Sequence, residues 1–164
     1  MLPDEDTFCD MYLMAGEYLS SNGYEKYEIS NFARRGFESR HNLKYWNFDE
    51  YLGLGPGAHS FVGGRRFSYT KNLVNYISSV NLGNDPCKDE DRLLSESDMV
   101  NERFMVNMRL TKGVADYSAL NIPQNKLDNY VKNGYIIKDS LGIRFSDEGF
   151  LVSNYILSDL ISFD

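Results

Sequence analysis

The sequence of 164 residues predicts an α+β fold, and three patterns support this expectation. Apolar residues recur at helical spacing from Phe8 to Leu19, which is typical of an amphipathic helix. Apolar and polar side chains then alternate around Tyr27 and Ile29, as in a half-buried strand. Helical periodicity dominates after Ser97, with a single predicted hairpin within it. A short α/β segment is therefore expected to precede a mainly helical one.

The N-terminal segment begins with helix-start chemistry, because Pro3 is followed by three acidic residues. The polar and glycine-containing residues 20–23 predict the end of this helix, and a strand is expected at 24–32. One helix and one strand cannot complete a sheet alone. Residues 1–70 therefore look like an incomplete part of an α/β unit, as in a segment cut from a longer chain.

The middle of the chain is expected to be mostly loop over residues 40–60, which hold both histidines and the only tryptophan. A short helix is predicted at 72–80, and the polar, turn-rich residues 81–91 are interpreted as a connector. The expected divisions of the chain are 1–70, 71–98 and 99–164.

The C-terminal part is expected to contain helices and one hairpin. Its predicted elements are a helix at 97–110 capped by Ser97, a short helix at 113–120, a helix opened by Pro123, a hairpin at 135–145 and a final helix at 146–161 capped by Ser146. This order predicts a winged-helix-like module. Acidic and basic residues nearly balance within it, so DNA binding is not expected.

Composition excludes several classes of function. Hydrophobic residues make up 42% of the chain, and the formal net charge is −7. The charge argues against a generic nucleic-acid or anionic-membrane surface, and no apolar run approaches the roughly 20 residues of a bilayer span. Cys9 and Cys87 have neither metal-site nor disulfide-framework spacing. A reducing, cytoplasmic setting is expected.

Two interpretations remain open for the rare residues in the middle of the chain. Alternating glycines at 53, 55 and 57 let a backbone approach a ligand closely, or they mark one backbone crossing another. His41 and His59 are too few for zinc, although one imidazole is enough to hold haem iron. The alternative for 41–46 is an ordered turn, in which Asn42 bonds the backbone and Trp46 fills the core.

Five arginines precede and follow this stretch in a chain of net negative charge. They are either a solvated surface or clamps for carboxylates such as haem propionates. The residues are Arg34, Arg35, Arg40, Arg65 and Arg66.

A family resemblance rests on two adjoining segments, "YEISNFARRGFESRHNLKYW" and "YLGLGPGAHS". They resemble the oxygen-independent coproporphyrinogen III oxidase-like family of radical SAM proteins. The H-N-x-x-Y-W element is similar to that of its haem-chaperone branch (HemW type). The C-terminal segments "ERFMVNMRLTKGV" and "FSDEGFLVSNYIL" are similar to the family's winged-helix-like domain.

The resemblance implies a parent protein that binds a [4Fe-4S] cluster and S-adenosylmethionine through a three-cysteine motif. Neither Cys9 nor Cys87 matches that motif. The chain is therefore expected to be the C-terminal part of such a parent, with residues 1–70 supplying the end of a partial barrel. By itself it is expected to hold no cluster and to perform no radical chemistry. Its expected partners are the N-terminal radical SAM half, haem or porphyrin, and an acceptor protein.

The resemblance also implies two groups of site residues. The group matched to haem binding, with His41 as the expected ligand of the haem iron, is His41, Asn42, Tyr45 and Trp46. The group matched to the loop on the S-adenosylmethionine side of the barrel is Gly53, Gly55, Gly57, Ala58 and His59. The related oxidases are expected to carry an apolar residue in place of His59.

Three functions follow for the parent and its C-terminal part. The first is a haem chaperone that passes haem to an acceptor protein. The second is an oxidase that decarboxylates the propionates of coproporphyrinogen III to vinyl groups. The third is a docking module without chemistry of its own. Whether the parent is an enzyme stays open at this point.

Overall fold

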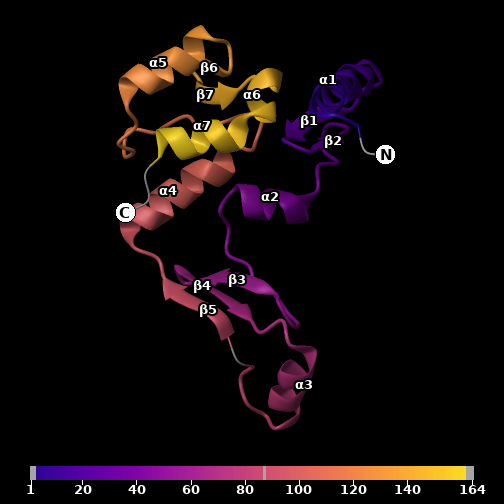
Figure 1. The fold of residues 1–164 in the computed structure, drawn as a ribbon, viewed down its shortest axis with the longest axis vertical. Coiled ribbons are helices and arrows are strands. Elements are labelled where there is room, and N and C mark those ends of the chain that lie inside the picture. The colour runs from indigo at the N-terminus through magenta and orange to yellow at the C-terminus, as the bar shows by residue number, and fades with distance from the viewer. Residues whose placement is uncertain (1–2, 87, 162–164) are drawn as a thin grey trace.

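The computed structural model describes residues 3–86 and 88–161, and Cys87 lies outside this range. Its mixture of helices and strands confirms the α+β class (Figure 1). The elements in chain order are α1 (Glu5–Ser21), β1 (Glu25–Glu28), β2 (Asn31–Ala33), α2 (Arg40–Trp46), β3 (His59–Val62), β4 (Arg65–Tyr69), α3 (Leu73–Asn81), β5 (Lys88–Leu93), α4 (Glu96–Asn107), α5 (Gln124–Lys132), β6 (Ile136–Asp139), β7 (Gly142–Phe145), α6 (Asp147–Leu151) and α7 (Ser153–Leu160).

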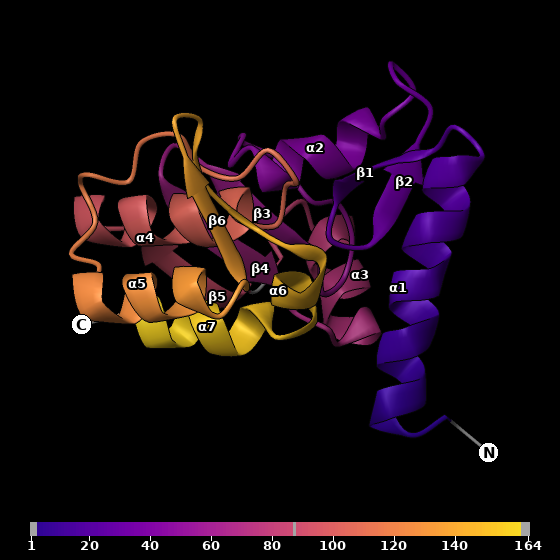
Figure 2. The same cartoon turned by 90° about the horizontal axis from the view of Figure 1, so that it is seen from above.

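Three groups of elements make up the molecule. Helices α4 to α7 and the hairpin β6–β7 form one group, and the sheet β3–β4–β5 with α3 lies at the opposite end (Figure 1). Helix α1 lies beside the hairpin β1–β2 at one flank (Figure 2). Helix α2 sits between these groups: its Trp46 carbonyl accepts a hydrogen bond from Asn107 of α4, and its Tyr45 ring packs against Tyr51, which pairs with Phe61 of β3.

Helix α1 confirms the predicted start and end of the first helix. The Asp4 carboxylate accepts a hydrogen bond from the Thr7 amide at 2.8 Å, and Gly23 adopts a φ of +81° just after the helix. No residue of α1 is buried, and its large apolar side chains are exposed, including Phe8, Met11 and Met14. The apolar side of this amphipathic helix therefore lies open on the molecule.

The single strand expected at 24–32 is wrong, because the chain reverses within it. Strands β1 and β2 pair antiparallel around a turn at residues 29–30. The fully buried Glu28 carboxylate accepts hydrogen bonds from the Ser30 amide, at 3.2 Å, and from the side chain of Asn31. Alternating polarity predicts strand but does not reveal that one side chain closes a turn in its middle.

The loop expected over residues 40–60 is also partly wrong. Residues Arg40–Trp46 form helix α2, whose first turn is capped by Ser39 accepting from the Asn42 amide at 3.3 Å. Strand β3 already begins at His59. The helix was hidden because its seven residues are too few to show helical periodicity.

The connector expected at 81–91 contains the start of a strand. Strand β5 pairs antiparallel with β4 at the edge of the three-stranded sheet. It is rich in charged side chains, which suits an exposed edge strand and explains its loop-like composition. The sheet therefore joins residues on both sides of the division that the sequence predicted at position 70.

The C-terminal group has the main core, in which Met108, Leu127 and Ile156 are fully buried. The predictions for three elements are confirmed to within a few residues: α3, α5 and the hairpin β6–β7. Ser146 caps α6 as expected, since its hydroxyl accepts a hydrogen bond from the Gly149 amide.

Three details of the C-terminal prediction are wrong. Helix α4 is capped by Ser95, which forms a capping box with Asp98, so Ser97 is not the cap. Residues 113–120 form no helix, because Val114 instead pairs with Ile143 of β7. The final helix is interrupted at Val152, between α6 and α7.

A tyrosine in the core makes stability sensitive to high pH. The Tyr130 hydroxyl donates to Asp159 at 2.9 Å, and burial, followed by this carboxylate, raises the pKa of Tyr130 to about 12. The folded state therefore keeps a proton that the unfolded chain loses near pH 10. We expect the free energy of unfolding to fall as pH rises from 10 to 12. Urea unfolding should show a shallower fall in Tyr130→Phe; an unchanged slope would contradict this assignment.

Candidate functional site

The exposed side of α2 presents the imidazole of His41. The hydroxyl oxygen of Tyr45, one helical turn later, lies 3.1 Å from Nε2 of His41, within hydrogen-bonding distance. The two rings meet edge to face, with centroids 5.0 Å apart. This contact fixes the imidazole through one nitrogen and leaves Nδ1 directed away from it. His41 is therefore oriented and accessible at the same time.

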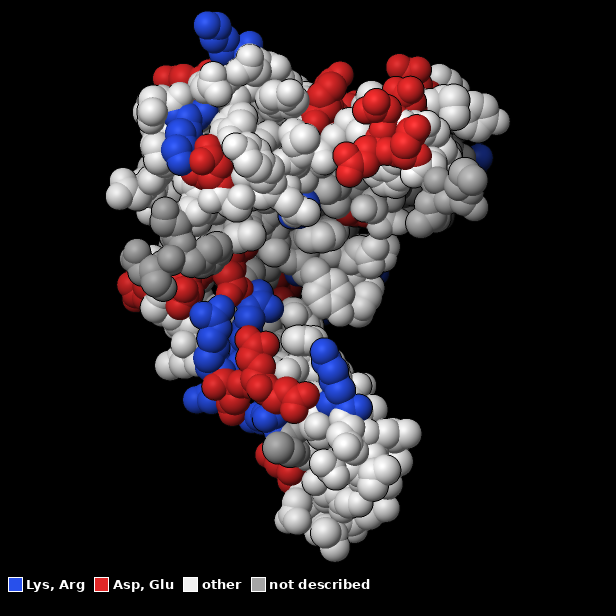
Figure 3. Space-filling view, in the orientation of Figure 1, with Lys and Arg blue, Asp and Glu red and all other residues white. Residues whose placement is uncertain are grey.

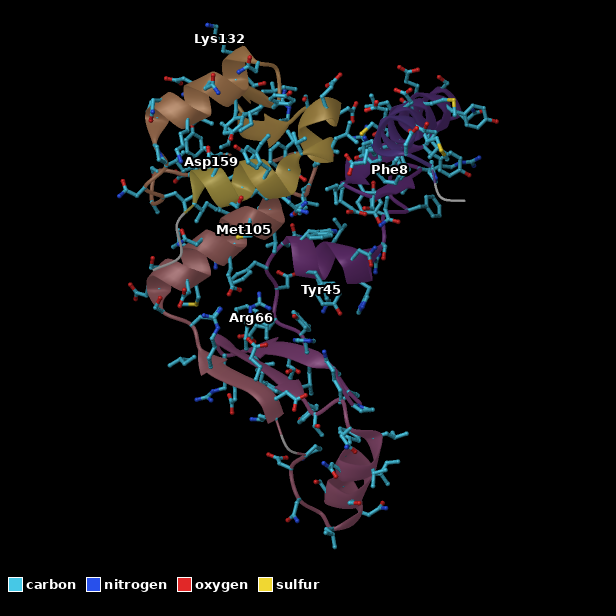
Figure 4. The ribbon with its side chains drawn as sticks, viewed as in Figure 1. Phe8, Tyr45, Arg66, Met105, Lys132 and Asp159 are labelled. Atoms are coloured by element: carbon cyan, nitrogen blue, oxygen red, sulfur yellow. The ribbon has the colours of Figure 1, made fainter. Side chains whose placement is uncertain are left out.

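Tyr45 is itself held by residues of the sheet. Its ring packs edge-on against Tyr51, with centroids 4.6 Å apart, and the Tyr51 hydroxyl accepts a hydrogen bond from the Arg66 guanidinium at 3.3 Å. Arg66 is paired with Glu102 of α4 and lies over the Phe61 ring. Figure 4 shows Tyr45 on the side of α2 that faces Arg66. A continuous series of contacts thus connects His41 to α4.

Trp46 and Asn42 have different surroundings from His41. The indole Nε1 of Trp46 is buried and has no hydrogen-bond partner within the described part of the chain. The Trp46 carbonyl accepts from the Asn107 side chain at 2.6 Å, which fastens the end of α2 to α4. Asn42 is half-buried, and its backbone amide donates the capping hydrogen bond to Ser39 described above. The four residues matched to haem binding therefore divide into the exposed His41 with its half-buried partner Tyr45, and an anchoring pair, Asn42 and Trp46.

The glycine loop runs alongside β3, and its first glycine is needed for that approach. A Cβ atom at Gly53 would lie 2.2 Å from the carbonyl oxygen of His59. The Gly53 amide donates to Ser60 Oγ at 3.0 Å, and Tyr51 pairs with Phe61 next to it. The crossing of two backbone segments therefore accounts for Gly53.

The rest of the loop is more open. Gly55 has a φ of +111° and no atom near the position that its Cβ would take, so a ligand can approach the backbone there. Gly57 is tied back, since its amide donates to the Thr70 carbonyl at 3.0 Å. The Ala58 carbonyl accepts from the Tyr69 amide, and His59 is exposed with Nδ1 3.8 Å from Glu90. His59 and His41 share no contact in the described residues, so the structure does not bring the two histidines together.

The five arginines separate into occupied and open ones. Arg65 is paired with Asp91 and Arg66 with Glu102, so both already bind carboxylates of this chain. The hydrogen bond from Arg65 is the main cause that lowers the pKa of Asp91. Arg34 lies over the Tyr24 ring, with its guanidinium carbon 5.2 Å from the ring centroid.

Three of the five arginines carry open positive charges near the start of α2. Arg34, Arg35 and Arg40 are exposed and remain accessible to an anionic ligand.

Sequence reasoning missed Tyr51 and Glu102, because no spacing in the sequence connects residues that meet only through the fold.

Within residues 3–86 and 88–161, no three His, Cys, Asp or Glu side chains are grouped so as to hold a metal ion. Acidic side chains gather over α1, while both signs of charge mix over β5 and α4 (Figure 3). No helix in the described residues is long and apolar enough to cross a membrane.

Comparison with known proteins gives consistent relatives, although no family model matches the chain. The heme chaperone HemW of Haemophilus influenzae is 32% identical over 168 residues, which cover 95% of this chain and 42% of that protein. HemW of Bacillus subtilis is 35% identical over 114 residues, covering 70% and 30%. HemW of Lactococcus lactis is 28% identical over 168 residues, covering 98% and 44%. The chain thus spans less than half the length of these relatives.

A solved structure shares the fold. It is described as coproporphyrinogen III oxidase (HemN) from Escherichia coli, a radical SAM enzyme. The match has a TM-score of 0.71 at 20% identity and covers 95% of this chain and 41% of that one. Together with the HemW relatives, it confirms the resemblance seen in the sequence. The chain belongs to the oxygen-independent coproporphyrinogen III oxidase-like family of radical SAM proteins, in the branch of the heme chaperone HemW.

Proposed function

We propose that this chain is the C-terminal part of a haem chaperone and that helix α2 supplies its haem ligand. The observation that carries the proposal is the exposed His41 imidazole, fixed by the Tyr45 hydroxyl at 3.1 Å. The names of the relatives, heme chaperone HemW, support the same ligand. The parent would take up haem and deliver it to a haem-requiring acceptor protein in the cytoplasm.

The residues on α2 fit a haem group. A single imidazole is sufficient to hold haem iron, and ligating histidines commonly bond a neighbour through their second ring nitrogen. Tyr45 contacts Nε2 of His41, which leaves Nδ1 for the iron. The exposed Arg34, Arg35 and Arg40 near the start of α2 suit the negatively charged propionates. When bound, haem would supply a redox-active iron, and these residues would orient and bind it.

The remaining cofactors belong to the longer parent. A [4Fe-4S] cluster and S-adenosylmethionine would be held by the N-terminal radical SAM half. Helix α1 and the β1–β2 hairpin would help to complete the partial barrel of that half. The exposed apolar side of α1 supports such packing, since a helix of this kind normally covers its apolar side. The loop around Gly55 and His59 would face S-adenosylmethionine. Helices α4 to α7 with the hairpin β6–β7 would form the winged-helix-like domain.

Haem titration tests the assignment of His41. We expect His41→Ala to weaken haem binding at least about tenfold and to shift the Soret band, because the iron loses its protein ligand. The titration should be followed by absorbance for the 164-residue chain and for its parent. Lys44→Ala is the matched control, since Lys44 is exposed on the same helix and has no part in the proposed site. If only His59→Ala changes the spectrum, His59 and not His41 is the ligand.

A second function is favoured by the structural match alone. The fold resembles that of the coproporphyrinogen III oxidase HemN, so the parent would oxidatively decarboxylate two propionates of coproporphyrinogen III. An anaerobic assay of the parent, loaded with its cluster, separates the two proposals. Formation of protoporphyrinogen would support the oxidase, and its absence together with tight haem binding would support the chaperone.

A further inference from the structure

A groove that has no part in the proposed haem site separates α1 from the α6–α7 junction. Its deeper part has a volume of about 420 Å³, within the usual range for small-molecule sites. Figures 1 and 2 both place α6 as the element of the C-terminal group nearest to α1. The wall is largely aromatic and aliphatic, with polar groups at one end. The apolar lining consists of Phe8, Tyr12, Ala15, Ile29, Phe32, Phe150 and Leu151.

The polar end of the groove is marked by Arg109. This half-buried guanidinium donates to Ser153 Oγ at 2.9 Å and to the side-chain oxygen of Asn154, both neutral groups. Burial lowers the pKa of Arg109. These two contacts leave several of the five guanidinium N–H donors without a partner.

Comparison with other arginines shows that this is unusual in the molecule. Among the described arginines, the half-buried ones are Arg66, Arg109 and Arg144. Arg66 is paired with Glu102, and Arg144 is paired with Asp139 at 2.8 Å. A partly desolvated charge is costly unless an opposite charge compensates for it. Arg109 is the described half-buried arginine that lacks such a carboxylate.

The nearby Lys26 does not change this conclusion. Its ammonium group is paired with Asp147 and lies over the Tyr12 ring, 4.4 Å from the centroid. Lys26 is therefore already compensated by Asp147 and adds no unpaired charge to the groove. Among the described residues that line this pocket, Arg109 is the one with a charged side chain, and it lies beside aromatic walls.

The groove continues away from Arg109 along α1. A second hollow of about 520 Å³ shares Phe8 and Leu151 with the first and extends to Cys9 and Val152. Asp4 and Glu5 line the far end. An anion is therefore favoured at the Arg109 end and opposed at the other, while the middle is apolar. Figure 4 marks Phe8 on α1, where the two hollows meet.

We infer that this groove binds a small amphiphilic monocarboxylate, with its carboxylate at Arg109 and an unbranched apolar tail along α1. Charge complementarity selects the carboxylate, since a guanidinium binds it through two parallel hydrogen bonds. The two adjoining hollows, which share Phe8 and Leu151, suit an extended tail. This site lies apart from α2 and adds a ligand class that the haem proposal does not require.

Decanoate and decanol test the inference, because they share an apolar tail and differ in charge. We expect the 164-residue chain to bind decanoate at least about tenfold more tightly than decanol in calorimetric titrations. Arg109→Gln should abolish this preference and leave decanol binding unchanged. Arg109→Lys should keep part of the preference, because the positive charge remains. Phe8→Ser, at an exposed position, should weaken both ligands.

Two outcomes would overturn the inference. The first is equal binding of decanoate by the natural chain and Arg109→Gln, with circular dichroism showing both folded. The second is decanoate binding that is lost in the longer parent, because a segment of the parent itself would then fill the groove. If Arg109→Gln does not fold, the pair Arg109→Lys and Phe8→Ser decides: loss of decanoate preference in the lysine variant counts against the site.

Discussion

Replacing Gly113 with alanine is expected to lower the free energy of unfolding by about 3–5 kcal/mol. The loss has two causes: overpacking by the added methyl group and the strain of a left-handed backbone at a residue with a Cβ. Gly113 has a φ of +63°, and a Cβ atom there would lie 2.1 Å from the Ile143 carbonyl oxygen. That oxygen accepts from the Val114 amide at 2.8 Å, and Ile143 is almost completely buried. The methyl group would push residues 113–114 away from β7 and disturb the C-terminal core. Urea unfolding of Gly113→Ala measures the loss.

Gly134→Ala is the matched control for this prediction. Gly134 also has a positive φ, +79°, but no atom lies near the position of its Cβ. We expect a loss of only about 1–2 kcal/mol, from the left-handed conformation alone. The difference between the two variants isolates the steric contact with β7. Equal losses would show that residues 113–114 move away from Ile143 at little cost, against this account.

Part of the fold could not be predicted from the sequence because, as at Gly113, it depends on contacts between residues far apart in the chain. Local chemistry predicted the elements that carry their own signals: acidic residues and Gly23 bound α1, and Ser146 caps α6. The helix expected at 113–120 failed because Val114 pairs with a residue about 30 positions later. Strand β5 was missed for a similar reason, since its charged composition only makes sense at a sheet edge.

The residues of the candidate site stay a prediction, and the structure adds how they lie relative to one another. The spacing of His41 and Tyr45 already allows them to meet across one helical turn, once α2 is known to be a helix. The support of Tyr45 by Tyr51 and Arg66 depends on the sheet, and no local pattern announces it. Trp46 was expected either in the core or beside a ligand; it is half-buried, and its indole Nε1 is buried without a hydrogen-bond partner among the described residues.

The second large effect concerns the glycine loop. We expect Gly53→Ala to lower the free energy of unfolding by about 2–3 kcal/mol, because its Cβ would lie 2.2 Å from the His59 carbonyl oxygen. The loop would have to separate from β3, which removes the bond from the Gly53 amide to Ser60. Urea unfolding gives the stability, and haem titration reports the indirect effect on the site. Haem affinity should fall less than in His41→Ala, since Gly53 acts only through Tyr51 and Tyr45.

Gly55→Ala separates the two readings of this loop. Its added methyl group meets open space, so the expected cost is the backbone strain at φ +111°, about 1–3 kcal/mol, without any steric contact. The contact between Tyr45 and Tyr51 should persist, and near-ultraviolet circular dichroism of the tyrosines should stay close to that of the natural chain. If the glycines served mainly as a ligand cradle, Gly55→Ala would impair ligand binding by the parent more than Gly53→Ala does. A larger stability loss in Gly53→Ala, with the tyrosine signal disturbed only there, would instead show that the first glycine serves the backbone crossing that holds helix α2 in place.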